Sequence, residues 1–155
     1  MKRDNHIKVG NRMRLCLPAY SVNEGVARSA VAAFCAQCDP TVTELADIKC
    51  AVSEAVTNCI VHAYREREGD IVIGLRLLPQ GGVRISVRDR GCGISNVKQA
   101  REPLFTTDAE GERSGMGFTV MESFMDKLYV HSKAGEGTLV VMTKYIGKNA
   151  AKSDE

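Results

Sequence analysis

The first third of the chain has the apolar spacing of two long helices, and the earlier one is expected to follow Ser21. Ser21 and Glu24 have the spacing of a capping box, and Asp39-Pro40 predicts the end of this helix at about Cys38. Side chains three and four residues apart share one face of a helix. The expected apolar stripe consists of Val22, Val26, Ala30, Ala33 and Phe34.

The second helix is predicted from about Val42 to Tyr64, and Thr41 with Glu44 offers a capping box at its start. Each residue of a helix is turned by about 100° from the one before it. One face of this helix is therefore apolar, and it consists of Leu45, Ile48, Val52, Val56, Cys59 and Ala63.

Strands are predicted in the second half of the chain and once near its start. Runs of apolar residues, several alternating with polar ones and bounded by turn residues, indicate strands at 11–17, 70–78, 83–89, 127–132 and 138–145. A short helix is expected at 115–125. Helices followed by hairpin-linked strands are typical of an α+β fold. We therefore expect a two-layer sandwich, in which a mixed, mostly antiparallel sheet carries helices on one face.

Composition narrows the class of protein. Of 155 residues, 44% are apolar and 26% are charged, and the net charge is +2, which suits one domain spanning 1–155. We expect 1–10 and 147–155 to be loosely held. Basic and acidic residues are interspersed, so no direct nucleic-acid partner is expected. No stretch approaches the ~20 apolar residues of a membrane span, so we expect a cytoplasmic protein without a membrane partner.

The six cysteines are expected to be reduced and mostly structural. The cytoplasm keeps thiols reduced, and free cysteine behaves as a small apolar residue. Cys35 and Cys38 form a C-x-x-C pair, but no second pair stands at the spacing of a metal site. We therefore interpret this pair as structural.

The second predicted helix carries a single full charge between Cys50 and Ala63, at Glu54. Asn58 and His62 follow at four-residue intervals and share its face, which lacks further charge, so we expect the helix to be enclosed on both sides. A buried carboxylate has to be paired, protonated or used. Either Glu54 and Asn58 hold a divalent cation and orient a hydroxyl group, or Glu54 meets a cation from another element and Asn58 caps a backbone group.

Two glycine-containing segments are candidate ligand-binding turns. Asp89-Arg90-Gly91-Cys92-Gly93-Ile94 places a carboxylate at a strand end, followed by backbone that a ligand can approach closely. Arg113-Ser114-Gly115-Met116-Gly117-Phe118 opens a helix, whose free amides and dipole favour an anion. Each pattern alone also fits an ordinary turn or loop.

In this order, the motifs E-x-x-x-N, D-x-G-x-G and G-x-G resemble those of the GHKL nucleotide-binding fold, also called the Bergerat fold. Three longer segments resemble the anti-sigma-F serine kinases of spore-forming bacteria, the AB factors of sporulation stage II. They are VSEAVTN at 52–58, AREPLFTT at 100–107 and ERSGMGFTVMESFMD at 112–126. The resemblance covers about residues 13–144. The chain departs from that family in its cysteine content and in an N-terminal extension of roughly ten residues.

The resemblance implies a role for each matching residue in binding Mg²⁺ with ATP or ADP. Glu54 would be the general base for phosphoryl transfer, Asn58 would hold Mg²⁺, and Asp89 would accept the adenine amine. Arg113 would act with Glu54 in catalysis by gripping the terminal phosphate. The other implied nucleotide contacts are Gly91, Gly93, Ile94, Thr106, Thr107, Ser114, Gly115, Met116, Gly117, Phe118 and Thr138.

The resemblance also implies partners. A homodimer would sequester an RNA polymerase sigma factor of the sigma-F type when ATP is bound, and would phosphorylate a serine of a small anti-anti-sigma antagonist. Arg28 is a candidate partner contact, with a solvated helix charge as its alternative. Two other functions stay open: a kinase serving a general stress sigma factor, and an ATP-gated binding module without catalysis. A sensor histidine kinase is disfavoured, because no dimerisation helix with a phosphoacceptor histidine precedes this domain.

Overall fold

A five-stranded sheet forms one layer of the protein, in the strand order β1-β2-β3-β5-β4. The structure is a computed structural model that describes residues 10–65, 67–103 and 116–147. The strands are β1 (Arg12–Pro18), β2 (Asp70–Leu77), β3 (Gly82–Asp89), β4 (Lys127–Lys133) and β5 (Gly137–Tyr145). Every pairing is antiparallel, and the predicted strand boundaries differ from these by one residue at most.

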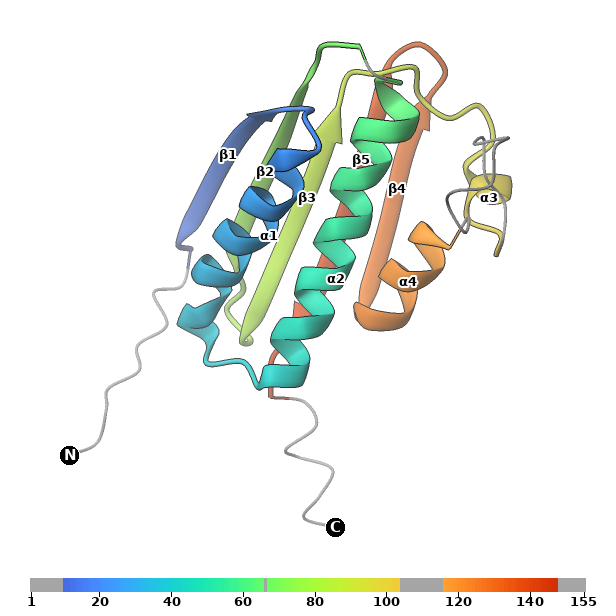
Figure 1. Ribbon diagram of the computed structural model, residues 1–155. Coiled ribbons are helices and arrows are strands. Elements are labelled where there is room, and N and C mark those ends of the chain that lie inside the picture. The colour runs from blue at the N-terminus through green and yellow to red at the C-terminus, as the bar shows by residue number, and fades with distance from the viewer. Residues whose placement is uncertain (1–9, 66, 104–115, 148–155) are drawn as a thin grey trace, which may run out of the picture.

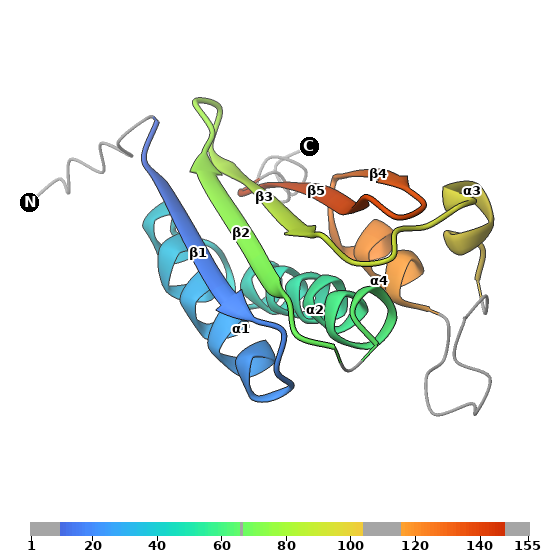
Figure 2. The ribbon, with the colours of Figure 1, turned by 90° about the horizontal axis from the view of Figure 1, so that it is seen from above.

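The second layer consists of helices on one face of the sheet, as Figures 1 and 2 show together. These helices are α1 (Val22–Cys35), α2 (Val42–Asn58) and α4 (Gly117–Phe124). A single turn, α3 (Val97–Ala100), lies near the β4 edge and was not predicted. The expectation of an α+β two-layer sandwich with helices on one face is confirmed.

Helix α2 lies between α1 and α4 and packs on the sheet (Figure 1). Its predicted apolar face is buried at Ile48, Val52 and Val56, and burial of each such side chain contributes roughly 1.5–3 kcal/mol. Ala51 and Ala55 are buried as well. The expectation that this helix is enclosed on both sides is therefore confirmed, and the enclosure fixes the direction in which its polar face points.

The helical segment runs from Val42 to Ala63, close to the predicted range of Val42 to Tyr64, but its last turn is not α-helical. Thr41 Oγ1 accepts from the Glu44 N–H at 3.1 Å, and Glu44 Oε2 accepts from the Thr41 N–H at 2.9 Å. The α-helix ends at Asn58, and Cys59–Ala63 forms a π-helical turn. Such a turn adds one residue to the helical ladder, and π turns are frequent at functional sites. Here it comes directly after the candidate cation ligand.

The predicted apolar stripe of α1 is confirmed at Phe34, but it is wrong in its phase over the rest of the helix. The exposed fractions of Val22 and Val26 are 75% and 48%, and Ala33 is also exposed. The buried residues of α1 are Ala27, Val31, Phe34 and Cys35, a second set with helical spacing, and packing on α2 selects it. The capping box at Ser21 is also absent, because Ser21 has helical φ and ψ instead of the extended backbone that a capping side chain needs.

The cysteine pair is part of the core, as expected. Cys35 and Cys38 are buried, and burial raises the pKa of the Cys35 thiol to about 12. Burial likewise raises the pKa of Cys38. All six cysteines are free thiols, and the exposed ones are Cys16, Cys50 and Cys92. In the described ranges no helix is both long and apolar enough to cross a membrane.

Candidate active site

A cavity of about 510 Å³ opens between the end of α2, the end of β3 and the start of α4. This volume lies within the range of small-molecule and cofactor sites. Of the residues singled out from the sequence, its lining includes Glu54, Asn58, Asp89, Gly93, Ile94, Met116, Gly117, Phe118 and Thr138. Gly91 instead packs against Ala63 behind the cavity wall. The remaining predicted nucleotide contacts lie outside the described residues: Thr106, Thr107, Arg113, Ser114 and Gly115.

Glu54 and Asn58 meet the first residue of α4 at one end of the cavity. A Cβ atom added to Gly117 would lie 3.2 Å from Glu54 Oε2 and 3.2 Å from Asn58 Oδ1. The bare backbone of Gly117 therefore lets α4 approach both side chains closely. No hydrogen bond or ion pair joins the side chain of Glu54 or that of Asn58 to another residue that the structure describes. The carboxylate and the amide oxygen are thus available, and hard oxygen donors of this kind suit Mg²⁺.

The start of α4 presents helix amides to the same end of the cavity. Met116 stands at its N-cap position without a capping side chain among the described residues, and Gly117 and Phe118 line the cavity. The first amides of a helix have no partner within the helix, and the helix dipole adds positive potential there. This end of the cavity therefore favours an anionic group beside Glu54 and Asn58.

Asp89 lines the cavity at the end of β3 and is 4% exposed. Its Oδ1 accepts from the Gly91 N–H at 2.9 Å and from the Thr138 N–H at 3.2 Å, and its Oδ2 accepts from Cys59 Sγ at 3.5 Å. Burial raises the pKa of Asp89, although these donors oppose that rise. Burial and the neighbouring carboxylate hold the pKa of Cys59 well above its usual value, so the thiol keeps the hydrogen that it donates.

The two carboxylate oxygens of Asp89 therefore differ. Oδ1 is occupied by two backbone N–H groups, whereas Oδ2 receives one weak S–H donor. A carboxylate oxygen accepts more than one hydrogen bond, so Oδ2 retains capacity for a ligand N–H group. Cys59 was not singled out as a site residue in the sequence. Its position directly after Asn58, on the apolar face of the helix, is the signal that it lies under the cavity.

The loop after Asp89 is held against two other elements. The Cys92 N–H donates to the Ala63 carbonyl at 2.9 Å, and the Gly135 N–H donates to the Cys92 carbonyl at 2.7 Å. The φ of Gly93 is +70°, and any side chain there would collide with the Lys133 carbonyl oxygen. Glycine is required at this position, and the cavity wall is consequently well fixed.

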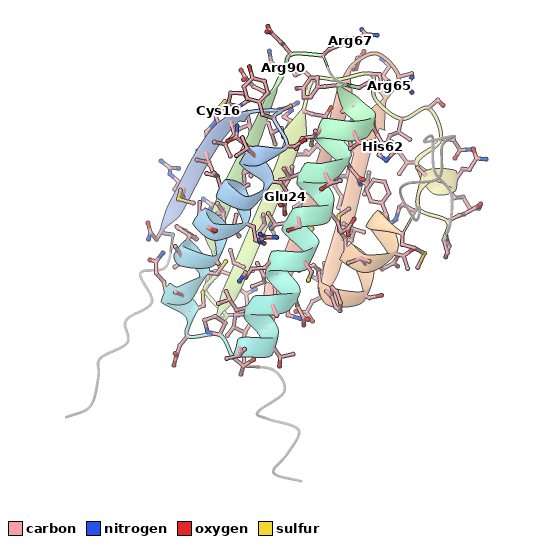
Figure 3. All side chains as sticks on the ribbon, viewed as in Figure 1. Cys16, Glu24, His62, Arg65, Arg67 and Arg90 are labelled. Carbon is pink, nitrogen blue, oxygen red and sulfur yellow. The ribbon has the colours of Figure 1, made fainter. Side chains whose placement is uncertain are left out.

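Further side chains line the rim near the end of α2, where Figure 3 shows His62 and Arg65. Both line the cavity, and Arg65 adds an exposed cation that the sequence interpretation did not include. Its signal would have been its place three residues beyond His62 and seven beyond Asn58. Arg28 lies elsewhere, on α1, where its guanidinium is 3.2 Å from Glu24 and its side chain is 42% exposed.

Comparisons with known proteins show the family and the fold of the chain. Residues 17–144 match the family model of the histidine kinase-like ATPase domain. A protein of Caldanaerobacter subterraneus subsp. tengcongensis named anti-sigma F factor is 56% identical, over 92% of this chain and 99% of its own length. A protein of Geobacillus thermodenitrificans with the same name is 52% identical, over 91% of this chain and 97% of its own length.

Solved structures share the fold at lower identity. The RsbU and RsbW domains of a Mycobacterium tuberculosis protein superpose with a TM-score of 0.65 at 22% identity, over 88% of this chain and 32% of that chain. The histidine kinase domain of a blue-light activated kinase from Erythrobacter litoralis gives 0.57 at 19% identity, over 85% of this chain and 65% of that chain. With the family match and the curated relatives, these findings show that the chain belongs to the anti-sigma F factor family, with the GHKL-type fold of the histidine kinase-like ATPase domain.

Proposed function

We propose that this chain is an Mg²⁺- and ATP-dependent protein serine kinase that also sequesters a sigma factor of the sigma-F type. One observation carries the kinase proposal. Glu54 is a half-buried carboxylate without a partner among the described residues, next to Asn58 and the start of α4, in the same cavity as Asp89. A site that only binds a nucleotide has no need of an unpaired carboxylate at this point.

In the proposed reaction, a serine hydroxyl oxygen of the acceptor protein bonds to the γ-phosphorus of ATP. Glu54 accepts the hydroxyl proton, and the bond to the β,γ-bridging oxygen breaks so that ADP leaves with its electron pair. The α4 amides at Gly117 and Phe118 stabilise the negative charge of the phosphates. Asn58 Oδ1 would hold Mg²⁺, whose charge neutralises the phosphate oxygens.

The experiment that tests the kinase proposal is incubation of the purified chain with labelled ATP, Mg²⁺ and candidate acceptor proteins from the same source. Label on a serine of a small acceptor is the expected result. A chain that binds a sigma factor in an ATP-dependent way, but labels no acceptor, would instead be the non-catalytic module. Comparison of purified sigma factors of the sporulation and general stress classes decides which one is bound.

Asp89 is expected to select the base, and Asp89→Asn tests it. Oδ1 faces two N–H donors, so the amide oxygen of the introduced asparagine must take that place, and its NH₂ group must take the place of Oδ2. A donor would then face the adenine amine. We expect ATP affinity to fall at least ~10-fold, about 1.4 kcal/mol, while inorganic tripolyphosphate binds as before. Calorimetric titration measures both.

The same variant separates a binding role from a structural one. Because burial raises the pKa of Asp89, the folded state binds more protons than the unfolded state between the two pKa values. Stability is therefore lost as pH rises through that window, and the neutral amide removes this loss. We expect the melting temperature of unliganded Asp89→Asn at pH 7 to equal or exceed that of the wild type; a variant that melts early would mark Asp89 as structural.

The partner proposal is supported by the start of α1. Tyr20, Val22 and Val26 are large exposed apolar residues close in sequence to Arg28, and exposed apolar groups beside a charge are typical of partner surfaces. We propose that this surface contacts the sigma factor or the anti-anti-sigma antagonist, and that the chain acts as a homodimer. Light scattering is expected to give twice the 16.9 kDa chain mass, and Val22→Asp is expected to weaken partner binding without lowering ATP affinity.

A further inference from the structure

Ser132 lies beneath the cavity at a junction of three groups. It stands on β4 directly opposite Thr138 of β5 in the strand register. Its Oγ accepts from the Ile94 N–H at 2.8 Å, donates to the Gly137 carbonyl at 2.9 Å, and lies 2.8 Å from Thr138 Oγ1. Ile94 and Thr138 both line the cavity. A single hydroxyl group therefore joins two parts of the cavity wall.

The hydrogens at this junction have one consistent arrangement. A serine hydroxyl has one hydrogen and two lone pairs. The Gly137 carbonyl only accepts, so the Ser132 hydrogen is committed to it at 2.9 Å. The bond between the two hydroxyls then requires Thr138 to donate to Ser132. With its hydrogen used in this way, Thr138 Oγ1 offers the cavity lone pairs only.

We propose that Ser132 is a positioning residue that makes Thr138 a hydrogen-bond acceptor, and so makes the base end of the cavity selective for adenine over 6-oxopurines. The inference rests on the proposed binding of ATP and deepens it. Thr138 stands beside Asp89, whose Oδ1 accepts from the Thr138 N–H, and Asp89 Oδ2 is also an acceptor. The base end of the cavity thus carries two neighbouring acceptor oxygens.

The 6-position of the purine distinguishes the possible ligands. Adenine carries an amino group there, with two N–H donors, whereas guanine and hypoxanthine carry a carbonyl oxygen. A carbonyl placed against two acceptors leaves polar groups unpaired, and sites built to hydrogen-bond a substrate group reject analogues that lack it by large factors. We expect the wild-type chain to bind inosine triphosphate about 10²-fold more weakly than ATP.

The test is Ser132→Ala, with ATP and inosine triphosphate as probes, because their bases differ at the 6-position and at the adjacent N1 proton. Without the serine oxygen, the Thr138 hydroxyl is free to rotate and donate to a carbonyl. We expect the ratio of the two dissociation constants, measured with Mg²⁺ by calorimetric titration, to narrow about 10-fold. A merely structural role for Ser132 lowers both affinities by the same factor and leaves the ratio unchanged.

Thr138→Val supplies the second arm, because valine neither donates nor accepts at nearly the same volume. It is expected to narrow the ratio, and adding Ser132→Ala in that background is expected to change the ratio no further. The inference is overturned if Ser132→Ala narrows the ratio of dissociation constants equally in the wild-type and Thr138→Val backgrounds. It is also overturned if the Ser132→Ala protein folds and keeps the wild-type ratio. If Ser132→Ala does not fold, an unchanged ratio in Thr138→Val overturns it. A wild-type chain that binds no ATP refutes the proposed function itself, and this inference with it.

Discussion

Replacement of Glu54 by glutamine is expected to lower phosphoryl transfer by about 10²-fold or more, with ATP affinity changed only a few-fold. Glutamine keeps the size of the side chain and one carbonyl oxygen, but it cannot accept the serine proton. Nucleotide binding depends on Asp89, Asn58 and the α4 amides, which this change leaves in place. Single-turnover transfer to the acceptor protein and calorimetric titration of ATP measure the two effects separately.

Glu122→Gln is the matched control, since it makes the same chemical change outside the cavity. Glu122 lies on α4 with a side chain that is 63% exposed, and its carboxylate is 3.6 Å from Arg101. Exposed ion pairs of this kind contribute little, so transfer is expected to stay at the wild-type rate. If Glu54→Gln transferred phosphoryl groups at the wild-type rate, Glu54 would not be the general base. The main argument against a non-catalytic binding module would then be lost.

The features of the fold and of the site that depend on residues close together in the chain could be predicted from the sequence. Turn-bounded runs of apolar residues gave β2 and β3 to within one residue, because each strand buries one side chain in two against the helix layer. The capping box at Thr41 also depends only on residues that are close in sequence. Glu54 and Asn58 lie one helical turn apart on the polar face of α2, so helix geometry alone predicts that they act together.

Features that depend on distant contacts were not predictable. Two sets of α1 residues have helical spacing, beginning at Val22 and at Ala27, and only packing on α2 decides which set is buried. The π turn after Asn58 is likewise linked to a contact beyond the helix, since Ala63 accepts a hydrogen bond from Cys92. The residues near each of these positions in the sequence therefore do not predict the packing of α1 on α2 or the hydrogen bond between Cys92 and Ala63.

Ser132 falls between these cases. Alternation along β4 places Ser132 on the same face as Leu128 and Val130, which pack against the core. A polar residue in an apolar phase is a signal that the sequence does contain. The role of Ser132 could not be predicted from this signal alone, because only the register of β4 with β5 shows that its hydroxyl group lies next to Thr138.

Replacement of Asn58 by alanine is expected to abolish the contribution of Mg²⁺ to nucleotide binding without unfolding the protein. The side chain makes no hydrogen bond to another described residue, so its removal leaves no partner unpaired. Alanine also has a higher helix propensity than asparagine, and Asn58 ends the α-helical part of α2. Thermal melting without nucleotide is therefore expected to be unchanged or slightly raised.

The measurement is ATP affinity with Mg²⁺ and with a chelator, for the wild type, Asn58→Ala and Asn58→Asp. Mg²⁺ is expected to strengthen ATP binding by the wild type and by Asn58→Asp, because a carboxylate supplies the same hard oxygen, and to have no effect on Asn58→Ala. Early melting of Asn58→Ala would show that the amide stabilises the fold. A full Mg²⁺ effect in a stable Asn58→Ala protein would place the cation elsewhere. Glu54, which lines the same cavity and faces Gly117 beside Asn58, would then be the residue to test as its ligand.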